Sequence, residues 1–188
     1  MFQNVGSEAG ASLAHVHAQI IGMPMVPDAV LEEWTYAERY HAERQRCVYC
    51  DMVGQERAGG SRILRETPSF VALCPFAPRS AYEFWVLPTR HTGRYEFIGE
   101  DELQELAGLF LDLTKALDLV LAEPAFNTYL HTAPLRSEAV PHYHWHWEVI
   151  PRTARAAGLE WGSGCFVNAV PPEQAAAEFR RAVTSRRS

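Results

Sequence analysis

Residues 9–24 read AGASLAHVHAQIIGMP, which is a loop of small residues, two histidines two positions apart, and an apolar run that stops at a proline. Alternation along a β-strand would place His15, His17 and Gln19 on one face. The small residues at 10–12 let backbone N–H groups come close to an anion, because no bulky side chain intervenes. A neutral imidazole beside such a loop is suited to attack on a phosphorus atom, although two ordinary histidines near a turn would show the same spacing.

The same pattern returns towards the other end of the chain. Phe2-Gln3-Asn4, a loop and the run 15–21 are echoed by Phe126-Asn127-Thr128, a loop and the run 144–150, and each run ends near a proline. The repeat predicts one complete unit and the tail of another. The expected boundaries are 1–27 for the tail of the first unit, 28–46 for a connecting helix and 47–188 for the complete second unit.

Periodicity and turn residues predict the remaining elements. Helical spacing of apolar residues predicts helices at 29–46, 100–122 and 172–185. Alternation predicts strands at 62–66, 69–76, 82–87, 126–131, 142–151 and 165–170, with glycine-bearing loops at 54–60 and 158–164. Hairpins pair strands antiparallel, so the predicted fold class is α+β, an antiparallel sheet flanked by helices.

Composition and charge limit the classes of protein to which the chain can belong. The chain has 188 residues, of which 47% are hydrophobic and 21% charged, as expected for a soluble globular domain with one core. A net charge of −6 argues against nucleic-acid binding. No segment resembles a membrane span or a signal peptide, so we expect no membrane partner and a cytoplasmic location with reduced thiols. Cys74 and Cys165 lie in apolar runs and are expected to be small buried side chains.

Cys47 and Cys50 form a CxxC pair. Such a pair is consistent with zinc binding, with redox chemistry or with chance. Zinc requires four ligands in a tetrahedron, so further ligands would have to come from elsewhere in the chain. A redox role is less favoured, because no thioredoxin-like βαβ pattern surrounds the pair.

These motifs together resemble the galactose-1-phosphate uridylyltransferase family of the histidine-triad (HIT) superfamily. The resemblance rests on FQNVG at 2–6, AGAS at 9–12, HxHxQ at 15–19 and GLEWGSG at 158–164. Val16 stands where the family usually has proline. The resemblance covers the whole chain, but it corresponds only to the end of the family's first half and the entire second half. It implies a HIT-like fold.

The resemblance implies roles for individual residues. His17 matches the nucleophile that takes a nucleotidyl group from a nucleoside-diphosphate sugar and passes it to a hexose 1-phosphate. Positions that hold the substrates are matched by Asn4, Ser12, Gln19, Gly158 and Glu160. The first three match residues that hold phosphate oxygens, and the glutamate matches a residue that binds hexose hydroxyls in the other subunit's site. A homodimer is therefore expected.

The resemblance also implies a zinc site. Its expected ligands are Cys47, Cys50, His91 and His144, in a closed structural arrangement. A competing set, Glu33, His131, His144 and His146, resembles the second metal site of other relatives, and one geometry cannot serve both sets through His144. The cysteine set is preferred because two thiolates bind zinc strongly. His131 and His146 would then pack nearby, and His142 would be an exposed loop residue.

The favoured function is a nucleotidyltransferase that moves UMP or AMP through a covalent nucleotidyl-histidine, in a shortened or partner-completed form. The family's first half supplies a further metal site, which His15 matches, and most of the base pocket. Two alternatives stay open. One is a zinc-stabilised paralogue that binds a ligand or partner without catalysis, and the other is a HIT-type hydrolase of nucleotide phosphates.

Overall fold

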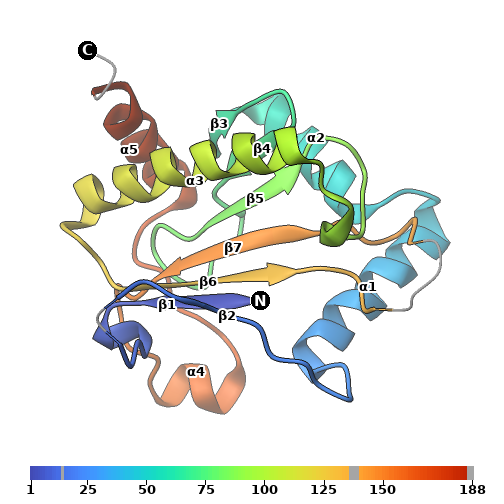
Figure 1. The fold of residues 1–188 in the computed structure, drawn as a ribbon, viewed down its shortest axis with the longest axis horizontal. Coiled ribbons are helices and arrows are strands. Elements are labelled where there is room, and N and C mark those ends of the chain that lie inside the picture. The colour runs from blue at the N-terminus through green and yellow to red at the C-terminus, as the bar shows by residue number, and fades with distance from the viewer. Residues whose placement is uncertain (14, 136–139, 186–188) are drawn as a thin grey trace.

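The computed structural model describes residues 1–13, 15–135 and 140–185, and it contains one seven-stranded sheet in the order β2-β1-β6-β7-β5-β4-β3 (Figure 1). All neighbouring strands run antiparallel. The strands are β1 (Phe2–Val5), β2 (Ala18–Gln19), β3 (Ile63–Glu66), β4 (Phe70–Leu73), β5 (Phe84–Pro88), β6 (Phe126–His131) and β7 (His146–Pro151). The predicted α+β class with an antiparallel sheet is confirmed.

Five α-helices and two short 3-10 turns are found in the described residues. The helices are α1 (Asp28–Arg44), α2 (Val48–Gly59), α3 (Glu100–Leu121), α4 (Gly158–Ser163) and α5 (Pro172–Ser185), and the 3-10 turns are η1 (Ser7–Ala9) and η2 (Tyr95–Phe97). None of these helices is long and apolar enough to cross a membrane.

Helices α3 and α5 cover one face of the sheet (Figure 1). The helical spacing that predicts α3 places Leu106, Leu109, Leu113 and Leu117 on one stripe, and all four are buried. Alternate residues of the strands pack against them, including the fully buried Phe84. This contiguous apolar layer is the main core of the molecule.

The opposite face of the sheet packs against α1 and α2. Val71, Leu73 and Leu87 point to this side, where they meet Tyr49 of α2 and Ala37 of α1. The packing places the first turn of α2, with its two cysteines, against the ends of β5 and β7. Helix packing on this face thereby positions the candidate metal ligands.

Two predicted loops and one predicted strand differ in the structure. The predicted loop at 54–60 is largely the second half of α2, which ends at Gly59 and is capped by Gly60 with φ of +67°. The loop at 158–164 contains α4. The run 165–170 is not a strand: its side chains at 165–167 are exposed, and the Asn168 amide instead hydrogen-bonds both the N–H and the carbonyl of Val170. Cys165 is accordingly exposed, whereas Cys74 is buried as expected.

The two copies of the sequence repeat lie side by side. Strand β1 from the first copy pairs along its whole length with β6 from the second, and Asn4 lies opposite Asn127. The HxH run of the first copy is regular only at Ala18 and Gln19, because β2 is a two-residue edge strand paired on one side. The strand predicted at 142–151 begins at His146.

Candidate functional site

The small-residue loop that leads into the first HxH motif is a tight turn closed by its own backbone. Gly6 takes φ of +82°, and a Cβ there would lie 2.8 Å from the Ala125 Cβ. Gly10 takes φ of +84°, and its N–H donates to the Ser7 carbonyl at 2.9 Å. Both positions therefore require glycine, since other residues are strained at positive φ.

His17 holds a defined tautomer. Its Nδ1–H donates to the His15 carbonyl at 3.0 Å, which leaves the lone pair of Nε2 available. The second HxH motif repeats this contact, because His146 Nδ1 donates to the His144 carbonyl at 3.1 Å. The two motifs thus share a backbone-fixed imidazole whose Nε2 can act as a base, a nucleophile or a ligand.

Two of the three residues expected to hold phosphate oxygens lie on the paired strands β1 and β2, and β2 directly follows this imidazole in the chain. Strand β1 pairs Phe2 with Gln19 and Gln3 with Ala18, and His17 directly precedes β2. Opposed residues of an antiparallel pair point to the same face, as do residues two apart. Asn4 and Gln19 therefore share one face at the edge of the sheet, where β2 directly follows His17 in the chain.

The other three expected substrate residues lie elsewhere in the structure. Ser12 is exposed on the loop that precedes the histidines. Gly158 begins α4, and the carboxylate of Glu160 accepts a hydrogen bond from the Ala157 N–H at 2.8 Å, which caps this helix. The capping contact lowers the pKa of Glu160. The carboxylate is therefore ionised at neutral pH.

The structure brings the four expected zinc ligands together. Cys47 and Cys50 lie at the start of α2, His91 follows β5, and His144 precedes β7. One donor atom from each of the four residues lies within 4.8 Å of all the others. Cys50 Sγ is 3.4 Å from His91 Nδ1 and 3.6 Å from His144 Nδ1. Two sulfurs and two imidazole nitrogens at this spacing are a donor set that suits tetrahedral zinc.

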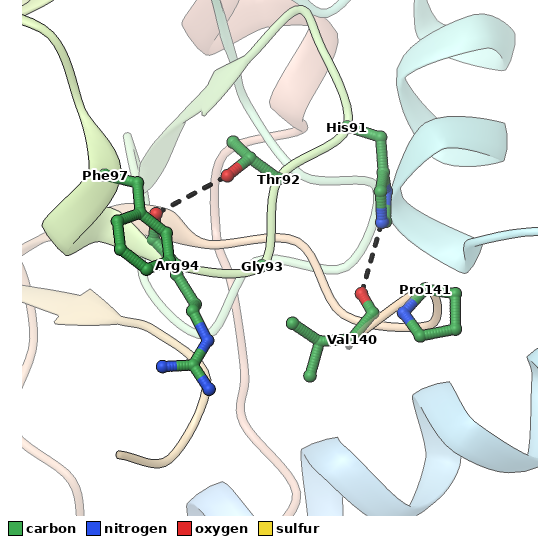
Figure 2. Close-up of a pocket in the computed structure, with 7 residues that line it drawn as sticks. All are labelled: His91, Thr92, Gly93, Arg94, Phe97, Val140 and Pro141. Atoms are coloured by element: carbon green, nitrogen blue, oxygen red, sulfur yellow. Dashed lines mark hydrogen bonds between the residues drawn. The ribbon is translucent and has the colours of Figure 1, made fainter. Parts of the chain in front are cut away.

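Outer contacts orient both imidazoles towards the sulfurs. His91 Nε2 donates to the Val140 carbonyl at 3.2 Å, as Figure 2 shows, and His144 Nε2 donates to the Pro88 carbonyl at 2.9 Å. These bonds place the Nδ1 lone pairs on the inner side, as ligating histidines require. The Cys50 thiol and the two imidazoles lower the pKa of Cys47, so the pair readily supplies a thiolate.

A pocket of about 410 Å³ adjoins this cluster. Figure 2 shows His91 on one side of it and Val140 and Pro141 on another, and the remaining lining residues are Thr92, Gly93, Arg94 and Phe97. A Cβ on Gly93 would lie 2.6 Å from a Val140 methyl carbon, so this position requires glycine for close packing.

A second group of possible ligands consists of Glu33, His131 and His146. His131 Nδ1 is hydrogen-bonded to the Glu33 carboxylate, and His146 Nε2 lies 3.6 Å from it. His146 Nε2 is buried and has no hydrogen-bond partner. His144 belongs to the cysteine cluster instead, so the expected competition for it does not arise and the two groups coexist.

Sequence reasoning missed the buried shell around this second group. Tyr49 and Tyr143 both donate hydroxyl hydrogen bonds to Glu33, and the Tyr143 bond is 3.0 Å long. Glu148, at the position in the second motif that Gln19 has in the first, lies 3.5 Å from His146 Nε2 and is paired with Arg79. The repeat itself could have indicated Glu148, but Arg79 carries no sequence signal.

His142 was expected to be exposed, and this expectation is wrong. The residue is 8% exposed and its ring meets Trp34 edge-on, with centroids 4.3 Å apart. Burial lowers the pKa of the imidazole, which therefore stays neutral at pH 7.

Comparison with known proteins identifies relatives along nearly the whole chain. It is 31% identical over 188 residues to the galactose-1-phosphate uridylyltransferase of Thermotoga maritima, covering 96% of this chain and 58% of the relative. It is 29% identical over 182 residues to the ADP-glucose phosphorylase of Arabidopsis thaliana, covering 96% and 50%. The chain therefore spans little more than half the length of these relatives. No family model matches it.

Solved structures agree with these similarities. A uridylyltransferase mutant superposes with a TM-score of 0.91 at 28% identity, covering 98% of this chain and 62% of that chain. An ADP-glucose phosphorylase from Arabidopsis thaliana with bound ADP-glucose gives 0.83 at 28% identity, covering 95% and 57%. A zinc-bound histidine triad protein from Mycobacterium smegmatis gives 0.52 at 18% identity, covering 75% and 95%, and shows a shared fold. The expected HIT-like fold is thereby confirmed.

Proposed function

We propose that this chain, whose sequence and fold are those of part of a galactose-1-phosphate uridylyltransferase family protein, carries the reacting histidine of a nucleotidyltransferase. The substrates would be a nucleoside-diphosphate sugar and a hexose 1-phosphate. The observation that supports this most directly is His17, whose Nδ1–H is bonded to the His15 carbonyl so that Nε2 presents a lone pair. Relatives named for both uridylyl transfer and ADP-glucose phosphorolysis leave UMP and AMP as the possible groups.

Transfer would proceed in two displacements at phosphorus. His17 Nε2 attacks the α-phosphorus of the donor, the N–P bond forms, and the bond to the bridging oxygen breaks as the sugar 1-phosphate leaves. A phosphate oxygen of the acceptor then attacks the same phosphorus and releases the histidine. Each transition state spreads negative charge over the phosphoryl oxygens, and neutral amide donors such as Asn4 and Gln19 would stabilise it.

A zinc ion would be held by Cys47, Cys50, His91 and His144. The donor set fits this ion, and its four ligands leave no open position, so zinc would supply structural cross-linking. The ligands join the start of α2 to the segments that flank β5 and β7. Glu33, His131 and His146 are three ligands with a buried, unpartnered Nε2, and they form a second candidate metal centre.

We propose that a further half or a partner completes the pocket for the base, because the matched relatives are nearly twice as long as this chain, while this chain itself supplies the reacting histidine. A groove of about 450 Å³ between α3 and strands β1 and β6 supports this arrangement. Phe110, Leu111 and Trp147 line it, and the buried Thr128 Oγ1 and Trp147 Nε1 have no hydrogen-bond partner within the described part of the chain. We propose that the completing half covers this groove, and that a homodimer presents Glu160 to the neighbouring site.

A non-catalytic role is the second candidate function. The observation that favours it is the coverage, since the chain spans only 50–58% of these relatives. A zinc-stabilised binding module would keep the cysteine cluster and need no reactive histidine.

The test is formation of a covalent adduct on the isolated chain. UDP-glucose and ADP-glucose are incubated separately with wild type and with His17→Asn, and intact mass is measured before and after mild acid. The proposal predicts an acid-labile gain of one nucleotidyl group in wild type, absent from the variant and discharged by a hexose 1-phosphate or, for a phosphorylase, by inorganic phosphate. An adduct that persists in His17→Asn would overturn the assignment, and absence of any adduct would favour the binding module.

A further inference from the structure

Asn127 joins the two copies of the repeat through three hydrogen bonds. Its Nδ2 group donates to Asn4 Oδ1 at 2.7 Å and to the Ala9 carbonyl at 2.9 Å. Its Oδ1 accepts from Arg152 Nε at 2.5 Å. Asn127 therefore contacts the neighbouring strand, the glycine-bearing turn and the segment that follows β7.

One of these partners can only accept a hydrogen bond and another can only donate one, and together they fix the orientation of the Asn127 amide. A backbone carbonyl can only accept, so the atom that faces Ala9 must be the NH2 group. A guanidinium N–H can only donate, so the atom that faces Arg152 must be the oxygen. No other rotation of the Asn127 amide satisfies both contacts.

The fixed orientation of Asn127 determines that of Asn4. Because Asn127 presents a donor to Asn4, the atom of Asn4 that faces it must be the acceptor Oδ1. The Nδ2 group of Asn4 then points to the opposite side. Among the described residues no hydrogen bond is recorded from Asn4 Nδ2. Asn4 follows Gln3, which pairs with Ala18, and His17 directly precedes β2, so this amino group lies at the sheet edge that carries the first HxH motif.

We propose that Asn127 and Arg152 are positioning residues that hold Asn4 with its amino group directed at the phosphoryl oxygens of the substrate. The inference rests on the proposed nucleotidyl transfer. A reversed Asn4 amide would present its oxygen to the negatively charged phosphoryl group, which repels it. Asn127 also holds the Ala9 carbonyl, so the turn that precedes the histidines keeps its distance from β6.

The substitution Asn127→Asp tests which atoms donate and which accept in these hydrogen bonds, with almost no change in side-chain shape. A carboxylate can only accept, so Asn4 has to rotate its amino group towards residue 127 and present its oxygen to the substrate. A hydrogen bond to a charged phosphoryl group is worth a rate factor of about 10 to 100, so we expect nucleotidylation of His17 to slow by that factor. Arg39→Gln, which removes an exposed ion pair on α1, serves as the control.

Side-chain amide exchange tests the orientation without any catalysis. In ¹⁵N-labelled wild type, we expect the Asn127 amino protons to exchange slowly with water, because both are hydrogen-bonded, and the Asn4 amino protons to exchange fast. Arg152→Leu should accelerate exchange at Asn127, whereas Arg152→Lys, which keeps a donor, should retain the slow rate.

The two readouts separate the failure of this inference from the failure of the proposed function. Fast exchange at Asn127 with slow exchange at Asn4 would overturn the positioning role, whether or not an adduct forms. An adduct that forms at the wild-type rate in folded Asn127→Asp would also overturn it. Absence of an adduct in wild type would reject the proposed transfer, while the exchange rates would still decide the orientation of Asn4.

Discussion

His17 and His146 occupy the same position in two copies of one motif, yet their surroundings differ. Each donates Nδ1–H to the carbonyl two residues earlier. His17 is only half-buried, whereas His146 is fully buried, stacked on Trp85 and close to the Glu148 carboxylate. The same local geometry thus presents the proposed reactive nitrogen at an open edge and a structural or ligating nitrogen in the interior.

The Glu148 carboxyl, which lies beside this buried histidine, should make the unfolding free energy depend on pH. Burial alone would raise the pKa of Glu148, but the neighbouring His146 imidazole and nearby positive charges, including Arg79, lower it from 4.5 to about 2. A carboxyl whose pKa is lower in the folded state stabilises the fold above its unfolded pKa and loses that contribution as pH falls. Between pH 4.5 and 2, wild type should lose up to about 3 kcal/mol of unfolding free energy through this group.

Urea denaturation of wild type and Glu148→Gln across this pH range measures the contribution. The variant should show a shallower fall in unfolding free energy on acidification. Glu43→Gln, on an exposed ion pair of α1, should keep the wild-type slope. Equal slopes in all three proteins would contradict the assignment.

At the scale of elements, the apolar periodicity of helix α3 predicts which of its side chains are buried. Leu113 is 0% exposed on its core stripe, whereas Leu111, two residues earlier, is 52% exposed. Leu113→Ala should lower the unfolding free energy by about 2 to 5 kcal/mol, because it removes buried apolar atoms and leaves a cavity. Leu111→Ala should change it by no more than about 0.5 kcal/mol, and chemical denaturation compares the two. Similar losses in both variants would show that the opposite face of α3 is covered in solution.

The elements that the sequence predicts well are those with periodic packing. Helix α3 and strand β6 follow their patterns to within one residue, since their own side chains decide their faces. Helix α2 was not predicted, and Gly54 and Gly59 even suggest a loop in its second half, although tertiary packing holds the helix. The run 165–170 was misread because strand propensity cannot reveal that no partner strand is present there in the described fold.

The candidate site likewise has a part that the sequence predicts and a part that it does not. The CxxC spacing and the family resemblance located the cysteine cluster, because ligand residue types and their spacing are visible in a sequence. The roles of Tyr143, Arg79 and Asn127 were not predicted, since each acts on a residue distant in the chain and only the tertiary fold brings the partners together.

The cysteine cluster links the start of α2 to the segments that flank β5 and β7, so loss of its metal should destabilise the fold. We expect about one zinc per chain by metal analysis, and Cys47→Ser should lose it with a marked fall in thermal stability, because one of four ligands is removed. Cys165→Ser is the matched control, since that cysteine is exposed and outside the cluster. Metal-free wild type with unchanged stability would contradict the proposal.

At the scale of the whole molecule, the sheet combines two unequal parts. Strands β1 and β2 extend the sheet beyond β6, and they carry Asn4 and Gln19 at its edge. Helices α3 and α5 cover one face, but the groove beside β1 and β6 is open. This asymmetry agrees with a chain that spans little more than half of its relatives, and it leaves His17, the proposed reactive histidine, near an edge of the sheet.

The most direct test of the account is where a nucleotidyl group becomes attached. The chain is incubated with UDP-glucose or ADP-glucose, digested at neutral pH to preserve acid-labile bonds, and its peptides are sequenced by mass spectrometry. The account predicts a nucleotidyl group on the peptide that contains His17, with none on the peptide that contains His146. A modified His146, or an adduct that remains in His17→Asn, would contradict it.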